Sequence, residues 1–416
     1  MIKKIIVSFG LLISMVTYAQ EGASSPYSFY GIGDVTFKGT VETRSMGGVS
    51  VFPDSIHVNL QNPAQYASLK LTTFTTGGTY SLYKAKTETQ EDKSRRTALN
   101  YLAVGVPAGK LGFGFGLIPY TSVGYKIQQL ANENTEISRR YNGIGGINKV
   151  FFGAGYKLSK KINIGVDIQY NFGNIETKSL RFVEGVQFGT RELNASNIQG
   201  VNFTTGITYQ TKIKNKFDFF SSFVFSPQSN LKLDNSRKIA TIQFFTQGSE
   251  FVVDEQVQDI KNTTVKLPSR ITFGTGFGVA KKWLLGSEVS FQSTSDLTNR
   301  FTDIDNVKYE NSSRFSLGGY FVPNYNSYSS YFKRVTYRGG LRYENTGLII
   351  EDKSIKDFAG NIGLGLPLSG TFSNINIGLE IGKRGTKYAG LIEENYINIS
   401  VGLSFSEKWF VKRKYN

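Results

Sequence analysis

Hydrophobic and polar residues alternate strictly along much of the chain. In residues 396–405 (YINISVGLSF) every second residue is apolar, and the residues between are polar or glycine. Residues 162–173 and 374–382 repeat this pattern. A period of two is the repeat of a β-strand with one apolar and one polar face. The pattern predicts about fourteen strands, which begin near residues 71, 97, 111, 147, 162, 200, 217, 266, 283, 312, 333, 356, 372 and 394.

Three features favour a membrane-spanning barrel over a soluble sandwich of sheets. The apolar faces often run for five or six positions, which suits a bilayer crossed by tilted strands of about ten residues. Tight turns alternate with long polar connections, as in outer-membrane barrels. The polar face carries mid-strand charges that a dry core would leave unpaired, and these are Asp167, Glu288, Arg338, Arg342 and Glu380. We therefore expect an all-β protein, a transmembrane antiparallel β-barrel with these charges in its lumen.

The connections are expected to differ between the two ends of the barrel. Tight turns are predicted near 108–110, 159–161, 213–216, 280–282 and 368–370. Long polar loops are predicted near 86–96, 128–146, 180–198, 230–262 and 384–390. In barrels of this class the short turns are periplasmic and the long loops face outward.

The N-terminus has the features of a secretory signal peptide. Lys3 and Lys4 precede an apolar run from Ile5 to Val16, and Thr17 and Ala19 suit a cleavage site. The alternative is a membrane anchor, but the run is too short to span a bilayer as a helix. The sequence thus predicts a signal peptide at 1–19 that is cleaved near Ala19, followed by an N-terminal hatch at 20–70, a barrel at 71–410 and a basic tail at 411–416.

The hatch is predicted from composition and from glycines elsewhere. Residues 20–70 are rich in Gly, Ser and Asn and lack sustained alternation. Inward glycines let another backbone approach a strand closely; the expected set is Gly112, Gly114, Gly116, Gly153, Gly155, Gly206, Gly274, Gly276, Gly278, Gly363, Gly365 and Gly402. The alternative is that these glycines only relieve curvature. A plug in the lumen predicts higher conductance when residues 24–66 are deleted.

The last strand is expected to carry the signals for insertion into the membrane. If its apolar residues face lipid, Ser400 faces the lumen and Val401 the bilayer, so an arginine should cost more at Val401 than at Ser400. Outward parity continues to the end of the chain, where aromatic rings suit the membrane interface. The predicted insertion and girdle residues are Phe405, Trp409 and Phe410.

Composition argues against an enzyme and against a metal or cofactor site. The chain has no Cys and only one His, His57, and no Gly-x-Ser-x-Gly segment. Glu288 and Glu380 could act as an acid–base pair, but a charge network with Arg338 and Arg342 is the simpler interpretation. We expect no catalytic residue, no metal and no cofactor.

The formal charge of +16 is concentrated in the tight turns and after the last strand. A basic ring at one end of a barrel fits contact with phospholipid headgroups. The alternative is a docking face for an acidic periplasmic partner. Nucleic acid is not expected in this compartment, whereas outer-membrane lipid and lipopolysaccharide are.

The hatch carries the residues of a family resemblance, which are Gly47, Gly48, Asn62, Pro63 and Ala64. A Gly-rich stretch followed by Asn-Pro-Ala, after a signal peptide and before the first strand, resembles the FadL-type outer-membrane transport family. That resemblance implies a barrel of fourteen strands with an N-terminal hatch. Gln65 and Tyr66 follow the motif here, where the family usually has Gly-Leu. No ligand-pocket motif is recognisable, so the resemblance carries no fatty-acid specificity.

Two functions stay open. The resemblance implies a bacterial outer-membrane channel for passive passage of small hydrophobic molecules, and this is the commoner role of the fold. The alternative is a non-transporting structural or docking subunit of a multiprotein complex, such as type IX secretion or the barrel-assembly machinery. Accessory barrels of this kind share the fold, and the segments SPYSFYGIGD and SEKWFVKRKYN resemble that branch. A channel should have an apolar pocket between hatch and wall.

Overall fold

The computed structural model describes residues 25–131, 136–183, 185–244, 250–297, 307–388 and 390–409. Its strands are β1 (Asp34–Val35), β2 (Thr72–Lys86), β3 (Glu91–Ala108), β4 (Leu111–Pro119), β5 (Thr121–Gln129), β6 (Ile137–Lys157), β7 (Ile162–Val183), β8 (Phe188–Ile213), β9 (Phe217–Ser226), β10 (Ser229–Phe244), β11 (Glu250–Gln258), β12 (Thr263–Leu267), β13 (Arg270–Val279), β14 (Trp283–Gln292), β15 (Val307–Tyr309), β16 (Ser312–Phe321), β17 (Thr336–Ile350), β18 (Lys353–Pro367), β19 (Asn374–Gly385) and β20 (Glu393–Glu407). The short helices are η1 (Pro26–Phe29), α2 (Val41–Arg44), η2 (Pro63–Ser68) and η3 (Thr294–Asp296). No helix among these residues is long and apolar enough to cross a membrane.

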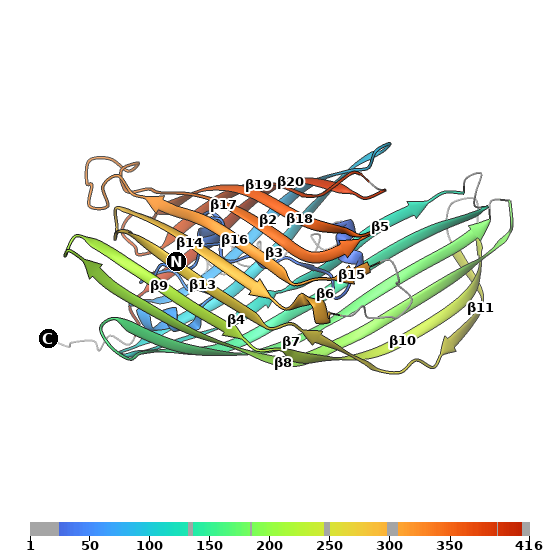
Figure 1. Ribbon diagram of the computed structural model, residues 1–416, viewed down its shortest axis with the longest axis horizontal. Coiled ribbons are helices and arrows are strands. Elements are labelled where there is room, and N and C mark those ends of the chain that lie inside the picture. Colours follow the sequence, from blue (N-terminus) through green and yellow to red (C-terminus); the bar gives the residue numbers. More distant parts are fainter. Residues whose placement is uncertain are drawn as a thin grey trace, which may run out of the picture.

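The strands form a closed antiparallel barrel (Figure 1). Among the described residues the wall has fourteen strands, and β20 closes it by pairing with β2 from Thr72↔Glu407 to Lys86↔Glu393. Three wall strands are interrupted, and three of the four breaks lie at a proline: Pro119 between β4 and β5, Pro227 between β9 and β10, and Pro268 between β12 and β13. The fourth break, residues 259–262 between β11 and β12, contains no proline. Proline lacks the N–H that a ladder needs. The expected fold and strand number are confirmed.

The two faces of the wall differ as the alternation predicts. Along β20, Val401 is 46% exposed and Phe405 is 49% exposed, whereas Ser400 and Ser404 are buried. Similar exposed apolar residues on β7, β8, β13 and β18 extend this outward face around the barrel. An outward apolar belt with a polar interior is the arrangement of a barrel in a bilayer.

Most segments that were expected to be long loops instead belong to strands. Within 230–262, β10 and β11 pair with each other in antiparallel register, and β7 and β8 run through most of 180–198. The exposed residues of β10 are mostly polar, whereas its apolar residues Leu231, Leu233 and Ile242 are buried in the interior. The apolar face there is the opposite of the lipid-facing one, so the pattern of the wall does not reveal this strand. Cross-strand ion pairs support these strands, including Arg191–Glu255 at 2.9 Å and Lys178–Glu250 at 2.6 Å. The hairpins extend the barrel at one end, called here the long-hairpin end (right in Figure 1).

The opposite end, called the short-turn end, has the expected tight turns and one long connection. Strand pairs are joined there by residues 109–110, 158–161, 214–216, 280–282 and 368–373. The connection between β16 and β17 is residues 322–335, which the sequence analysis did not separate from the strands.

Candidate functional site

The N-terminal segment, residues 25–71, follows the lumen from one end to the other. At the long-hairpin end the Ser25 hydroxyl donates to Glu394 at 2.7 Å. At the short-turn end the carbonyl of Ile56 accepts from the hydroxyl of Ser406 at 3.2 Å. The segment is therefore bound to the barrel wall at both mouths of the lumen.

Apolar side chains of the segment fill the lumen at the long-hairpin end. Tyr27 packs with Ile350, Ile355 and Leu391. Ile32 packs with a larger buried cluster, which contains Val123, Tyr125, Ile147, Ile175, Ile198, Leu231, Leu233, Val265 and Leu267. These residues are buried against one another, so they contribute cohesion to the interior.

Inward glycines bring the segment's backbone close to the wall. A Cβ atom on Gly112 would clash with the backbone of Tyr66, and one on Gly340 with the backbone of Met46 and Gly47. Further glycines that lie against the segment are Gly114, Gly153, Gly155, Gly165, Gly206, Gly274, Gly276, Gly318, Gly363 and Gly402. Within the set expected from sequence, Gly116, Gly278 and Gly365 have only barrel residues among their nearest atoms.

The five motif residues lie in two tight bends of the segment. Gly47 and Gly48 follow α2 with φ of +70° and +93°, and a side chain on Gly47 would clash with the backbone of Leu341. Asn62 caps η2, because its Oδ1 accepts from the N–H of Ala64 at 3.0 Å. Pro63 occupies the first turn, where its missing N–H costs nothing. The motif thus shapes the backbone against the wall.

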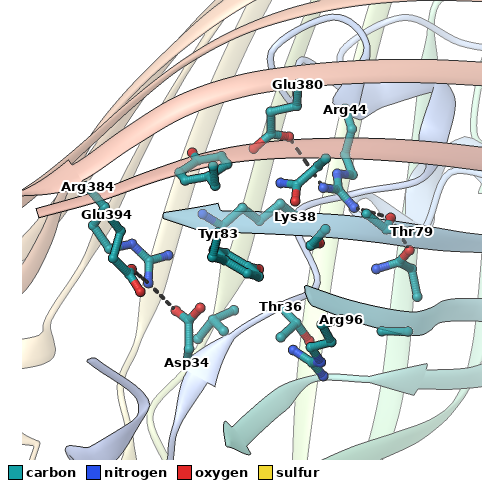
Figure 2. A pocket seen from close by; sticks show the side chains of 16 residues that line it. Asp34, Thr36, Lys38, Arg44, Thr79, Tyr83, Arg96, Glu380, Arg384 and Glu394 are labelled. Atoms are coloured by element: carbon teal, nitrogen blue, oxygen red, sulfur yellow. Dashed lines mark hydrogen bonds and ion pairs between the residues drawn. The ribbon is translucent and has the colours of Figure 1, made fainter. Parts of the chain in front are cut away.

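A buried charge network lies at the centre of the interior. Arg342 contacts Glu380 at 3.1 Å and Asp357 at 3.4 Å, and all three side chains are nearly inaccessible to water. The segment joins this network through three ion pairs. These are Lys38–Asp357 at 2.9 Å and, in Figure 2, Arg44–Glu380 at 3.4 Å and Asp34–Arg384 at 3.1 Å. Removing one member would leave a partner charge buried and uncompensated. The network therefore fixes the segment to β17, β18 and β19.

Two other expected lumen charges contact the segment elsewhere. Asp167 lies 3.4 Å from the hydroxyl of Tyr66. Glu288 accepts from the backbone N–H of Ser50 at 3.0 Å and from its hydroxyl at 2.8 Å, and lies 3.8 Å from Arg314. The expected network of Glu288 with Arg338 and Arg342 is therefore wrong, because strand register places Glu288 beside Ser50 instead.

His57 and Arg338 belong to a cluster near the short-turn end. The His57 imidazole contacts Asp54 at 2.8 Å and Glu42 at 3.8 Å. Asn376 accepts from Arg338 at 2.9 Å and donates to Glu42 at 2.7 Å. Burial opposes protonation of the ring, but the Asp54 carboxylate outweighs burial and raises the pKa of His57. The Asp54 carboxylate thus favours the protonated form of the ring.

Two small cavities lie in the interior of the described part of the chain. Each has about 50 Å³ of space for water molecules, which is room for a few waters. One is lined by Lys38, Arg44, Arg384 and Glu394 among others (Figure 2). The other is lined by Lys149, Arg270, Glu288 and Arg314 among others. Both linings mix charged side chains with apolar ones, such as Val35 and Ala98 in the first and Phe37 and Leu60 in the second.

A seam in the wall lies beside the first cavity. β3 pairs with β4 only from Leu102↔Leu117 to Ala108↔Leu111, whereas β5 pairs with β6 and β1. Residues 91–101 of β3 therefore have no ladder to β5. Behind the seam, β3 contributes Arg96, Ala98 and Asn100 to the cavity lining. The side chains that line the cavity behind the seam include charged ones, such as Arg96 and Glu394. Pro119 was the sequence signal that could have located the seam.

The ends of the chain complete the account of the expected residues. Phe405 lies on the outward face of β20, and Trp409, just beyond the strand, is 56% exposed. Phe410, the tail 411–416, and the signal peptide 1–19 with its cleavage site lie outside the described residues. In the described part of the chain no group of three or more Asp, Glu and His residues is placed to hold a metal ion.

Solved structures with this fold are transport barrels. The Ralstonia pickettii toluene transporter TbuX superposes with a TM-score of 0.60 at 13% identity, over 89% of this chain and 99% of its own. The Pseudomonas putida toluene transporter TodX gives 0.59 at 14% identity, over 89% and 99%. A Pseudomonas aeruginosa FadL homologue gives 0.54 at 12% identity, over 91% and 98%. The FadL-type fold expected from the hatch motif is thus confirmed.

Comparison of sequences gives a family. No curated protein sequence matches the chain significantly. A model of the family described as BamG matches residues 1–416, which is the whole chain. The chain therefore belongs to the BamG family, within the FadL-type barrel fold.

Proposed function

We propose that this protein is a non-transporting accessory barrel of a multiprotein complex in the bacterial outer membrane. The observation that carries the proposal is the filling of the lumen. The N-terminal segment is fixed by buried ion pairs from Lys38, Arg44 and Asp34 to the wall, and the cavities around it are small and charged.

Membership of the BamG family supports an accessory barrel. An outward apolar belt and the FadL-type fold support the outer membrane as its location. Long polar hairpins at one end and a basic rim at the other offer surfaces for envelope proteins, because charged rims steer association with partners.

Purification from native outer membranes tests the proposal. The tagged protein, extracted in a mild detergent, should migrate as a complex with partners near one-to-one stoichiometry. A matched sample in a harsh detergent should release the barrel alone. Recovery of a lone barrel under both conditions would contradict the docking function.

The second candidate is a channel for small hydrophobic molecules. The fold shared with TbuX and TodX, together with the unpaired seam between β3 and β5, favours it. Native mass spectrometry with toluene and with a long-chain fatty acid separates the candidates. A docking barrel should bind neither compound, because charged residues such as Arg96 and Glu394 lie behind the seam. Saturable binding of either compound would favour the channel.

A further inference from the structure

The connection between β16 and β17, called here the aromatic loop (residues 322–335), differs from every other described connection at the short-turn end. It has 14 residues, whereas the others have two to six. It contains no acidic residue. Its exposed aromatic side chains are Tyr325, Tyr328, Tyr331 and Phe332, of which Tyr328 is fully exposed and Phe332 is 73% exposed.

The aromatic loop is held in a defined shape. The N–H of Asn324 donates to the carbonyl of Lys333 at 2.8 Å, which closes the loop on itself. Val322 and Val335 at its base are buried. Preorganised aromatic side chains lose little conformational entropy on binding. The exposed rings are therefore presented from a fixed base.

The C-terminal part of the aromatic loop contacts a residue of the lipid-facing wall. The hydroxyl of Tyr337 donates to the carbonyl of Phe332 at 3.3 Å. Tyr337 is on the outward face of β17, in register with Phe321 of β16, and both rings are exposed there. Phe332 therefore lies at the edge of the apolar belt and not over the mouth of the lumen.

Cations accompany the rings. The Nζ atom of Lys281, from the neighbouring turn, lies 4.8 Å from the ring centre of Tyr325. The Cζ atom of Arg334 lies 5.6 Å from the ring centre of Tyr331. Lys333 directly precedes Arg334 in the sequence. Aromatic rings with adjacent Lys and Arg suit the layer where acyl chains meet phosphates.

We propose that the aromatic loop and the turn containing Lys281 bind phosphate-bearing lipid headgroups of the leaflet at the short-turn end. The rings of Tyr328 and Phe332 insert at the level of the headgroups, and Lys281, Lys333 and Arg334 contact the phosphates. The position of Phe332 beside the lipid-facing Tyr337 favours lipid over a soluble protein as the occupant. The inference holds whether the barrel docks or transports.

Fluorescence quenching tests this proposal on the full mature chain in nanodiscs. Trp283 and Trp409, the only two tryptophans, are replaced by Phe, and Phe332→Trp provides a single reporter. The bilayer is phosphatidylcholine with a minor fraction of brominated phosphatidylglycerol or brominated phosphatidylcholine. Ile399→Trp, on the lipid face, and Val257→Trp, exposed on β11, are the lipid and solvent controls.

The Phe332→Trp reporter should be quenched by brominated lipid as the Ile399→Trp control is, and more strongly by brominated phosphatidylglycerol. Each of Lys281→Ser, Lys333→Ser and Arg334→Ser should lower that headgroup preference by up to about fivefold. Quenching as weak as in the Val257→Trp control would overturn the proposal. Equal quenching by the two brominated lipids before any charge is removed would also overturn it.

Discussion

A single imidazole reports the charge state of the lumen near the short-turn end. His57 is the only histidine in 416 residues, and its contact with Asp54 raises its pKa above the ordinary value of 6.5. In a Strep-tagged protein, NMR of the ¹³C-labelled ring should therefore titrate above pH 6.5. Asp54→Asn should lower the midpoint. A wild-type midpoint at or below 6.5 would contradict the ion cluster.

The same group links the stability of the segment to pH. A folded-state pKa above the unfolded value means that His57 contributes stability that is complete below pH 6.5 and is lost as pH rises through the folded pKa. Amide protection factors near Asp54–His57, corrected for the intrinsic exchange rate at each pH, should fall over that upper window. His57→Gln should abolish this fall, and a variant that keeps it would assign the effect to another group.

Two adjacent glycines on β17 allow the contact between segment and wall to be tested separately from the effect of a bulkier residue in the strand. Gly340 faces inward against the backbone of Met46 and Gly47, whereas a Cβ on Gly339 would meet nothing closer than 3.9 Å. Gly340→Val should destabilise the protein by about 1–3 kcal/mol through overpacking. Gly339→Val should change stability little. Urea unfolding in liposomes measures both, and equal effects would mean that the segment does not press on the wall.

At the level of the strand, the two faces of β20 should differ in the substitutions that they tolerate. Val401 faces lipid and should cost roughly 2–4 kcal/mol when replaced by arginine. Ser400 faces inward and shares a hydrogen bond of 2.8 Å with Thr79, so Ser400→Ala should cost about 1 kcal/mol. Urea unfolding in liposomes gives both values. Greater damage from Ser400→Ala would reverse the facing of this strand.

Arginine is a poor probe of the inward face at Ser400. Ser400 is buried, and its partner Thr79 also binds Arg44 of the segment at 3.0 Å. An arginine at Ser400 would therefore be overpacked in the interior. Alanine is the informative substitution at that position.

Strand positions were predictable from sequence, and strand lengths were not. Within the bilayer, lipid imposes alternation, so the predicted starts at 111, 162, 217, 283 and 312 coincide with β4, β7, β9, β14 and β16. Beyond the bilayer the outward face is solvated, and the apolar residues of β10, such as Leu231 and Leu233, are buried in the interior instead. The partners of the inward side chains could not be predicted either. Glu288 contacts Ser50 because of the strand register and the path of the segment, and neither follows from the alternation.

At the scale of the whole molecule, one continuous segment ties distant walls of the barrel together. It contacts β20 through Ser25 and Glu394, β18 through Lys38 and Asp357, and β7 through Tyr66 and Asp167. A barrel of fourteen strands is wide enough to need a plug or to hold a channel. Among the described residues, the segment fills much of this width with its own side chains.

Single-channel conductance in planar bilayers tests closure of the lumen most directly. The wild-type protein should show no conductance steps, because residues 25–71 occupy the lumen. A variant that lacks residues 24–66 should show large, stable steps, once its barrel is verified by heat-modifiable migration and β-rich circular dichroism. Large, stable steps from the wild-type protein, or an equally silent deletion variant with an intact barrel, would contradict the closed, docking barrel.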